Sequence, residues 1–441
     1  MRKAIVAVVG RPNVGKSTFF NRIVGRRVSI VEDTPGVTRD RIYAEAEWRG
    51  VSFALIDTGG IEPSSADVIF SGMRAQAEAA MDTADAIVFM LDGKDGLTAT
   101  DRDVADMLMR TRKTVIPVVN KIDTAALPAN FYDFYELGLG EPLAVSAANM
   151  FGLGEVLDRI VEALPNGETD GAEDDAIGIA VIGKPNVGKS SLVNALLGEE
   201  RVIVSEVAGT TRDAIDTPLE RDGERFILID TAGLRRKSKV ADDIERYSVI
   251  RAIAAIERSD VCLLMLDARE GVTEQDKRIA GLAHEAGKGV VIVVNKWDLI
   301  EKETDTMKRF QKDLRGELSF LSYAPDVFIS VLQKQRLANV LERARFVAEK
   351  RALRVPTGRL NSLIADAVMM KPPPSDKGRR LKIYYVSQVG VKPPLFLFKV
   401  NDEALMHFSY ARYLENRMRE AFGFEGSSIK FLYRGKGDRD V

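Results

Sequence analysis

The sequence contains the same eight-residue loop twice, at positions 173 residues apart. Residues 10–17 read Gly-Arg-Pro-Asn-Val-Gly-Lys-Ser, and residues 183–190 read Gly-Lys-Pro-Asn-Val-Gly-Lys-Ser. A short apolar run precedes each loop and a helical pattern follows it. In such a loop the backbone amides surround phosphate groups, and the helix N-terminus adds a favourable dipole. We therefore expect two α/β domains, each with a phosphate-binding loop.

The residue types in both loops suit a nucleoside triphosphate. Lys16 and Lys189 are expected to reach the β- and γ-phosphates, and the hydroxyls of Ser17 and Ser190 to ligate Mg²⁺. The predicted phosphate-binding residues are Gly10, Arg11, Pro12, Asn13, Val14, Gly15, Lys16 and Ser17 in the first copy, and Gly183, Lys184, Pro185, Asn186, Val187, Gly188, Lys189 and Ser190 in the second.

A second motif lies 47 residues after the start of each loop, at the end of an apolar strand. Its aspartate, Asp57 or Asp230, is placed to hold Mg²⁺ through water, and the amide of Gly60 or Gly233 can bond the γ-phosphate. The expected residues are Asp57, Thr58, Gly59, Gly60 and Ile61, and Asp230, Thr231, Ala232, Gly233 and Leu234. Ile61 and Leu234 stand where small signalling GTPases carry a water-orienting glutamine.

A third motif, Asn-Lys-x-Asp, identifies the base. Its aspartate accepts hydrogen bonds from the ring N–H and the exocyclic amine of guanine, whereas adenine would leave that carboxylate unpaired. The predicted base-binding residues are Asn120, Lys121, Ile122 and Asp123, and Asn295, Lys296, Trp297 and Asp298. Ser146-Ala147-Ala148 forms the expected supporting loop, whereas the second copy has Ser330-Val331-Leu332-Gln333.

Two polar segments at Thr38 and Thr211 are predicted to be switches, because a threonine there can close over Mg²⁺ only when the γ-phosphate is present. The predicted catalytic residues are Lys16, Thr38, Gly60, Lys189, Thr211 and Gly233. The predicted magnesium ligands are Ser17, Thr38, Asp57, Ser190, Thr211 and Asp230.

Charge and composition separate the end of the chain from the rest. The net charge of the 441 residues is −2, but from Arg351 onward 17 basic and 9 acidic side chains give +8. This favours an anionic partner, and structured RNA suits it better than a membrane, since the segment has no long amphipathic basic helix. A solvated basic face is the alternative. One cysteine, Cys262, fits a reducing cytoplasm, and no apolar run reaches 18 residues.

The predicted domains are a first GTP-binding domain (1–164), an acidic linker (165–175), a second GTP-binding domain (176–353) and a small α+β domain (354–441). The last has the pattern α-β-β-α-β. Its Gly423-Phe424-Glu425-Gly426 joins a helix to a strand, so we interpret Gly423 as a helix C-cap rather than part of an RNA-gripping loop. Tyr384, Tyr385 and Phe431 are expected in the core. The expected RNA contacts are Arg379, Arg380, Lys382, Arg434 and Lys436.

These motifs resemble the EngA/Der GTPases, bacterial proteins with two tandem G domains and a C-terminal KH-like domain. The resemblance covers essentially the whole chain. It implies GTP hydrolysis, action in assembly of the large ribosomal subunit, and binding to that subunit and its rRNA as a monomer, without membrane or DNA. Ser330 to Gln335 departs from the family's Ser-Ala-x-x-Gly-Gln.

In this family and its relatives, the loop asparagine helps coordinate K⁺, which implies that Asn13 and Asn186 do so here. Two weak GTPases that mainly hold nucleotide remain the alternative for the two sites. For the whole chain, the alternative is a non-catalytic RNA-binding scaffold with structural GTP.

Overall fold

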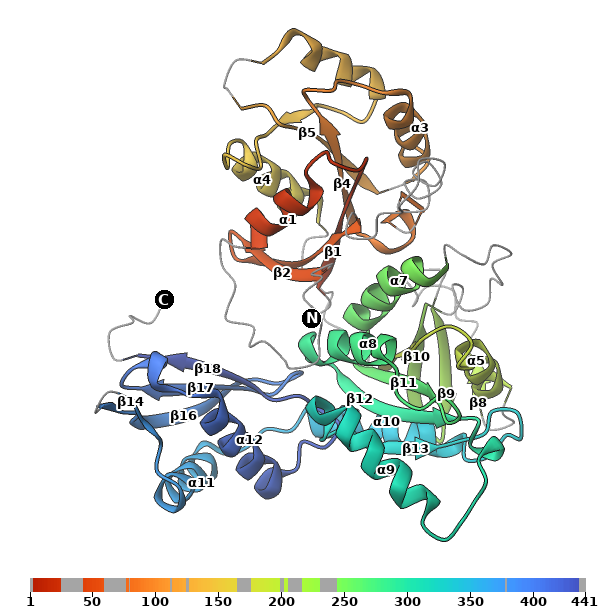
Figure 1. Ribbon diagram of the computed structural model, residues 1–441, viewed down its shortest axis with the longest axis vertical. Helices are drawn as coiled ribbons and strands as arrows, with labels where there is room; N and C mark the ends of the chain where they lie inside the picture. The colour runs from red at the N-terminus through yellow and green to blue at the C-terminus, as the bar shows by residue number, and fades with distance from the viewer. Residues whose placement is uncertain are drawn as a thin grey trace. The chain divides into compact units, whose positions relative to one another are not determined.

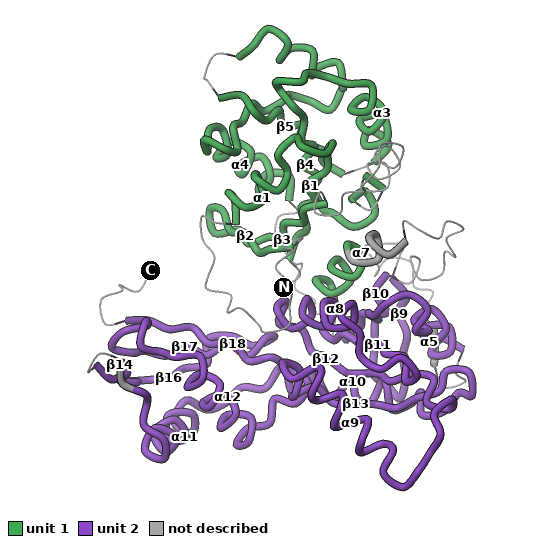
Figure 2. Tube along the Cα trace, viewed as in Figure 1, with its two compact units in different colours: residues 1–174, 237–258 green, residues 175–236, 259–441 purple. Residues whose placement is uncertain are grey.

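The computed structural model describes residues 3–24, 43–58, 77–78, 80–111, 113–123, 127–164, 176–198, 202–204, 216–230, 244–376 and 379–435. For residues 202–204, 244–249 and 375–376, it describes the backbone alone. These residues form two compact units, shown in Figure 2: residues 1–174 with 237–258, and residues 175–236 with 259–441.

The first unit contains a six-stranded sheet in the order β2-β3-β1-β4-β5-β6. All its pairings are parallel except that of β2 with β3. Strands such as β4 are apolar up to their last residue, here Asp92, because both sheet faces are buried. The strands are β1 (Ala4–Gly10), β2 (Tyr43–Trp48), β3 (Val51–Asp57), β4 (Ala86–Asp92), β5 (Thr114–Asn120) and β6 (Leu143–Ala144).

The apolar faces of two helices, α1 (Lys16–Val24) and α4 (Leu153–Ala163), join the strands in one core cluster. Phe19, Phe20 and Ile23 of α1 have the three- and four-residue spacing that places side chains on one helical face. Helix α3 (Ala99–Leu108) follows β4, and the 3₁₀ segment η2 (Ala129–Leu137) follows β5. The unit also includes α7 (Ile244–Arg258).

The second unit repeats this plan in a seven-stranded sheet, in the order β13-β12-β11-β7-β10-β9-β8. As in the first sheet, the central strand is the one that leads into the phosphate-binding loop. The strands are β7 (Ile177–Ile182), β8 (Val202–Val204), β9 (Thr217–Arg221), β10 (Glu224–Ile229), β11 (Val261–Asp267), β12 (Gly289–Asn295) and β13 (Asp326–Phe328). The helices are α5 (Lys189–Leu197), α8 (Glu274–Glu285), α9 (Thr306–Glu317) and α10 (Ala338–Arg351).

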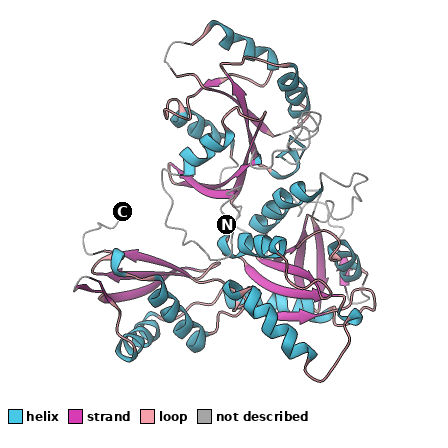
Figure 3. Ribbon diagram, in the orientation of Figure 1, coloured by secondary structure: helices cyan, strands magenta, loops and turns pink. Residues whose placement is uncertain are grey.

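The C-terminal part of this unit has the predicted order α-β-β-α-β. Helices α11 (Thr357–Met370) and α12 (Phe408–Phe422) lie on the same side of a three-stranded sheet (Figures 1 and 3). The sheet consists of β16 (Ile383–Gly390), β17 (Leu395–Val400) and β18 (Lys430–Arg434), with β17 in the centre. A short hairpin, β14 (Ser375–Asp376) with β15 (Arg379–Arg380), precedes it.

The Gly423–Gly426 turn joins this C-terminal part to the seven-stranded sheet. Gly423 is the C-cap of α12, as predicted. The Gly426 amide donates to the Tyr323 carbonyl at 2.8 Å, and the Val290 amide donates to the Gly426 carbonyl at 2.7 Å. A Cβ on Gly426 would lie 2.2 Å from a methyl carbon of Val347, so only glycine fits there. The turn is therefore a docking element within the protein.

The core prediction was wrong for two of the three aromatic residues. Tyr384 and Tyr385 are 55% and 44% exposed, whereas Phe431 packs against the core beside Phe398. Tyr385 is adjacent to the buried Val386, so the alternation of the strand itself places it on the opposite face of the sheet. Tyr384 is the extra residue of a register shift between Ile383 and Tyr385. Strict alternation from Val386 would have placed Tyr384 on the core side of the sheet.

Candidate functional site

The two phosphate-binding loops have the same internal geometry. The Lys16 ammonium donates to the carbonyls of Gly10 (2.8 Å) and Arg11 (2.6 Å). The Lys189 ammonium donates to those of Gly183 and Lys184, both at 2.7 Å. Each lysine is also the first residue of the helix that follows. Burial lowers the pKa of Lys189 to about 8.

Backbone conformation explains several residue types in these loops. Gly15 and Gly188 have φ values of 96° and 101°, where a side chain is strained. Asn13 and Asn186 have φ values of 65° and 63°, in the left-handed region that asparagine tolerates better than most residues. Both asparagine side chains are exposed, whereas Val14 and Val187 are buried. Each loop is thus anchored by its valine and presents its asparagine outward.

Two of the predicted magnesium ligands touch in the first site. The Ser17 hydroxyl donates to Asp57 Oδ2 at 2.7 Å, and Asp57 is buried at the end of β3. A hydroxyl and a carboxylate side by side suit a hard cation such as Mg²⁺. Asp230 lies at the corresponding end of β10, where its amide donates to Asp216 Oδ1 at 3.0 Å.

A buried asparagine connects each phosphate loop to the loops that are predicted to bind guanine. Asn120 donates to the Val14 carbonyl at 2.8 Å and accepts from the Ala147 amide at 2.9 Å. Asn295 makes the same two bonds, to the Val187 carbonyl (2.9 Å) and from the Val331 amide (3.1 Å). The second copy thus keeps this connection although its supporting loop has a different sequence, because the bond uses a backbone amide.

The two aspartates predicted to read guanine have different surroundings. Asp123 accepts from the Ser146 hydroxyl (2.8 Å) and Asn149 (3.1 Å), and forms an ion pair with Lys94 (3.0 Å). The hydrogen bond from Ser146, followed by that from Lys94, lowers the pKa of Asp123. Asp298 has no such side-chain partner within the described residues.

The lysines of the base motif are held by carboxylates at the ends of the neighbouring strands. Lys121 pairs with Asp92 and Lys296 with Asp267, both at 2.5 Å. Burial alone would raise the pKa of each carboxyl, but the lysine hydrogen bond, the backbone amide hydrogen bonds and the lysine charge together outweigh it, and the pKa values are lowered. Ile122 and Trp297 are buried, and the Trp297 ring packs against Phe310 and Phe328.

The second residue of each phosphate loop is tied to a buried aspartate that the sequence analysis missed. Arg11 Nε donates to Asp101 Oδ1 at 2.9 Å, and Lys184 lies 3.5 Å from Asp276 Oδ2. Both aspartates are fully buried and cap their own helices, α3 and α8, as the last residue of a Thr-x-x-Asp capping box. This motif also occurs twice, at 98–101 and 273–276, and could have been found by that repetition.

Some predicted site residues lie outside the described part of the chain. They are Thr38, Gly59, Gly60, Ile61, Thr211, Thr231, Ala232, Gly233 and Leu234. Lys436, an expected RNA contact, also lies there.

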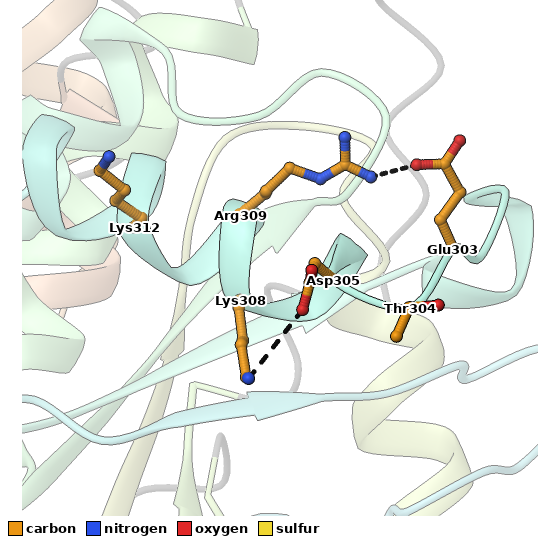
Figure 4. Close-up of a pocket in the computed structure, with 6 residues that line it drawn as sticks. All are labelled: Glu303, Thr304, Asp305, Lys308, Arg309 and Lys312. Atoms are coloured by element: carbon orange, nitrogen blue, oxygen red, sulfur yellow. Dashed lines mark hydrogen bonds and ion pairs between the residues drawn. The ribbon is translucent and has the colours of Figure 1, made fainter.

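A surface cavity of about 610 Å³ lies apart from these loops, around the start of α9 (Figure 4). Its walls are polar or charged, and ion pairs join Lys308 to Asp305 and Arg309 to Glu303. Its lining contains none of the nucleotide-site residues and no aromatic side chain.

Similarity to known proteins identifies the family of the chain. The chain is 59% identical over 440 residues to "GTPase Der" of Alkaliphilus oremlandii, covering all of both chains. It is 59% identical to the Clostridium tetani protein of the same name, covering 98% of this chain and 99% of that one. The chain belongs to the EngA/Der family of GTPases. As a member of it, the chain binds and hydrolyses GTP and uses Mg²⁺.

Family models match the same regions. The model "50S ribosome-binding GTPase" matches residues 5–121 and 178–296, and "KH-domain-like of EngA bacterial GTPase enzymes, C-terminal" matches residues 354–434. The predicted architecture of two P-loop domains and a KH-like domain is confirmed. A solved structure of Aquifex aeolicus Era bound to GDP.AlF4- is also similar, at 22% identity and a TM-score of 0.31, covering 75% of this chain and 93% of that one. Within the described residues, no helix is long and apolar enough to cross a membrane.

Proposed function

We propose that this GTPase acts in assembly of the large ribosomal subunit and binds that subunit and its rRNA more tightly with GTP than with GDP. One observation carries the proposal. Two phosphate loops, each tied through a buried asparagine to its guanine-reading loop, share a chain with a C-terminal segment of charge +8. The family model's description as a 50S ribosome-binding GTPase supports it. The protein is proposed to be a cytoplasmic monomer. Its anionic partner is proposed to be RNA rather than DNA or a membrane.

The proposed domains are residues 1–164, 176–353 and 354–441, with a linker at 165–175. The proposed site residues are those of the three motifs in each copy. The lysines bind the β- and γ-phosphates, and the terminal aspartates of the Asn-Lys-x-Asp motifs read guanine. Ser17 and Asp57, which already touch, and their counterparts Ser190 and Asp230 would hold Mg²⁺. Bound there, Mg²⁺ supplies positive charge that offsets the charge of the phosphates.

We further propose that K⁺ stimulates hydrolysis. Neither copy has the water-orienting glutamine after its Asp-x-x-Gly motif, so hydrolysis must depend on other groups, and a bound cation can stabilise the charge that develops on the phosphates. Asn13 and Asn186 are exposed at the outer turn of each phosphate loop, where an amide oxygen can ligate a cation. Hydrolysis at the first site should rise when K⁺ replaces Na⁺ at constant ionic strength.

The Asn13→Ala variant tests this assignment, with Asn149→Ala as the matched control on the base side. Loss of the K⁺ response in Asn13→Ala alone is expected. An equal rate in both salts, or a response that survives in Asn13→Ala, would contradict the assignment.

Cosedimentation tests the proposed function. Purified protein is mixed with large or small ribosomal subunits in the presence of GDP or a nonhydrolysable GTP analogue. We expect the most binding with large subunits and the analogue. Equal binding in both nucleotide states, or preference for small subunits, contradicts the proposal. GTP turnover that stays absent with K⁺ and large subunits would favour the RNA-binding scaffold.

A further inference from the structure

The sheet of the C-terminal part has one face that its own helices do not cover. Both α11 and α12 pack on the side that bears Val386, Phe396 and Phe398, which are fully buried. By the alternation of a strand, the other side carries residues from all three strands. We call this side the open sheet face. It consists of Tyr385, Ser387, Leu397, Lys399, Leu432 and Arg434.

The register places these side chains in two rows across the strands. Tyr385, Lys399 and Arg434 are direct neighbours in one row, and Ser387, Leu397 and Leu432 in the next. Adjacent strands are about 4.8 Å apart, so each row spans roughly 10 Å. Tyr385 thus lies beside Lys399, and Arg434 lies on the far side of Lys399 in the same row.

The open sheet face combines exposed apolar area with positive charge. Tyr385 is 44% exposed and Leu432 is 39% exposed, and Lys399 and Arg434 are exposed as well. None of the six positions carries a carboxylate. Aromatic and apolar side chains exposed beside cations indicate a binding surface rather than an ordinary solvated one.

The chemistry favours unpaired RNA over the other anionic partners. Sheet surfaces that bind single strands stack bases on aromatic rings, while neighbouring cations contact the phosphates. A duplex would offer phosphates to the cations but no free base to Tyr385. The Gly423–Gly426 turn is not available for this purpose, because Gly426 is packed against Val347 and bonded to Tyr323 and Val290.

We propose that the open sheet face binds an unpaired segment of RNA, with a base stacked on Tyr385 and phosphates contacted by Lys399 and Arg434. The inference rests on the proposed association with ribosomal RNA, and it specifies the surface and the form of RNA that it recognises.

The test uses the full-length protein and a fluorescent 12-nucleotide RNA of mixed sequence, free or annealed to its complement. Fluorescence anisotropy measures binding to each form. Tyr385→Phe keeps the ring and should bind the single strand like the wild type. Tyr385→Leu keeps the apolar area but removes the ring, and should bind at least about 5-fold more weakly, the lower end for loss of one stacked base.

The cations are tested by a double variant, Lys399→Gln with Arg434→Gln. It should weaken binding and reduce the logarithmic salt slope by roughly 1.4, or about 0.7 for each phosphate contact. The matched control is Arg359→Gln with Arg412→Gln, which removes the same charge from exposed positions on α11 and α12. The control should keep the wild-type slope. Unchanged GDP binding and thermal unfolding show that each variant is folded.

Three results would overturn the inference: equal binding by Tyr385→Leu and Tyr385→Phe, an equal loss in the two double variants, or duplex binding as tight as single-strand binding. Cosedimentation separates this failure from that of the proposed function. If large subunits bind wild type and Tyr385→Leu equally, only the open sheet face is refuted. If large subunits do not bind the wild type with either GDP or the GTP analogue, the proposed function itself fails.

Discussion

Replacing Asp101 with asparagine should weaken nucleotide binding at the first site, although Asp101 touches no predicted nucleotide-contacting group except Arg11. Asp101 Oδ1 accepts from Arg11 at 2.9 Å, and its Oδ2 accepts from the amide and hydroxyl of Thr98. An asparagine can present its oxygen to one side only, so its NH₂ group must face a donor on the other. The carbonyl of Arg11 also accepts from Lys16, so the phosphate loop loses an anchor next to its lysine.

The expected loss of nucleotide affinity follows from the burial of the Arg11–Asp101 hydrogen bond. A hydrogen bond to a charged group contributes about 1.5–3 kcal/mol. Arg11 retains 18% side-chain exposure and can turn toward water, which places the loss at the lower end of that range. If the whole loss appears in affinity, GDP binding at the first site weakens by about 10-fold or somewhat more.

The assay is titration with a fluorescent GDP in a Lys189→Ala background, so that only the first site is read. Asp95→Asn is the control, since it removes the same charge from an exposed carboxylate 3.9 Å from Arg11. The control should stay within about twofold of the parent. If Asp101→Asn matches that control, the tether does not position the loop, and Asp101 is only a helix cap.

Three further predictions concern the base, the docking turn and the second lysine. Asp123→Asn should shift the preference of the first site from guanine to xanthine nucleotides in competition binding; unchanged GDP affinity would show that Asp123 does not read the base. Gly426→Ala should lower the unfolding temperature of the second unit through a cost of about 1–3 kcal/mol, since its Cβ would lie 2.2 Å from Val347, whereas Gly435→Ala has open space and should not. Because burial lowers the pKa of Lys189 to about 8, the charged form is complete below that pH, and nucleotide binding at the second site in a Lys16→Ala background should weaken as pH rises through 8. An affinity that stays flat from pH 7 to 9.5 would contradict this.

The sequence predicted the two P-loop GTPase domains well because their motifs have fixed spacing. Residues 4–9 and 177–182 became β1 and β7, the central strands of their sheets, since unbroken apolar runs between turn residues suit strands buried on both faces. Both loops then follow at the strand ends, as the motif requires. In the second copy, Asn295 still connects the phosphate loop to the altered loop at Ser330–Gln333, because it accepts a hydrogen bond from the backbone amide of Val331. A comparison of side chains alone does not reveal such a bond.

The wrong core assignments and the missed contacts also have physical causes. Tyr384 and Tyr385 are exposed for two reasons: Tyr384 is the residue inserted into β16, and Tyr385 alternates with the buried Val386. The Asp101 and Asp276 tethers join segments about 90 residues apart, so only the fold brings them together. The docking role of Gly426 depends on contacts with Val347 and Tyr323, which lie far from it in the sequence.

The central claim is that one chain holds two working guanine nucleotide sites. Equilibrium dialysis with labelled GDP at saturating concentration measures it directly, as the number of nucleotides bound per chain. The account predicts two for the wild type, and one each for Lys16→Ala and Lys189→Ala. A wild-type value of one that Lys189→Ala leaves unchanged would contradict it, and would show that the altered loop at Ser330–Gln333 has disabled the second site.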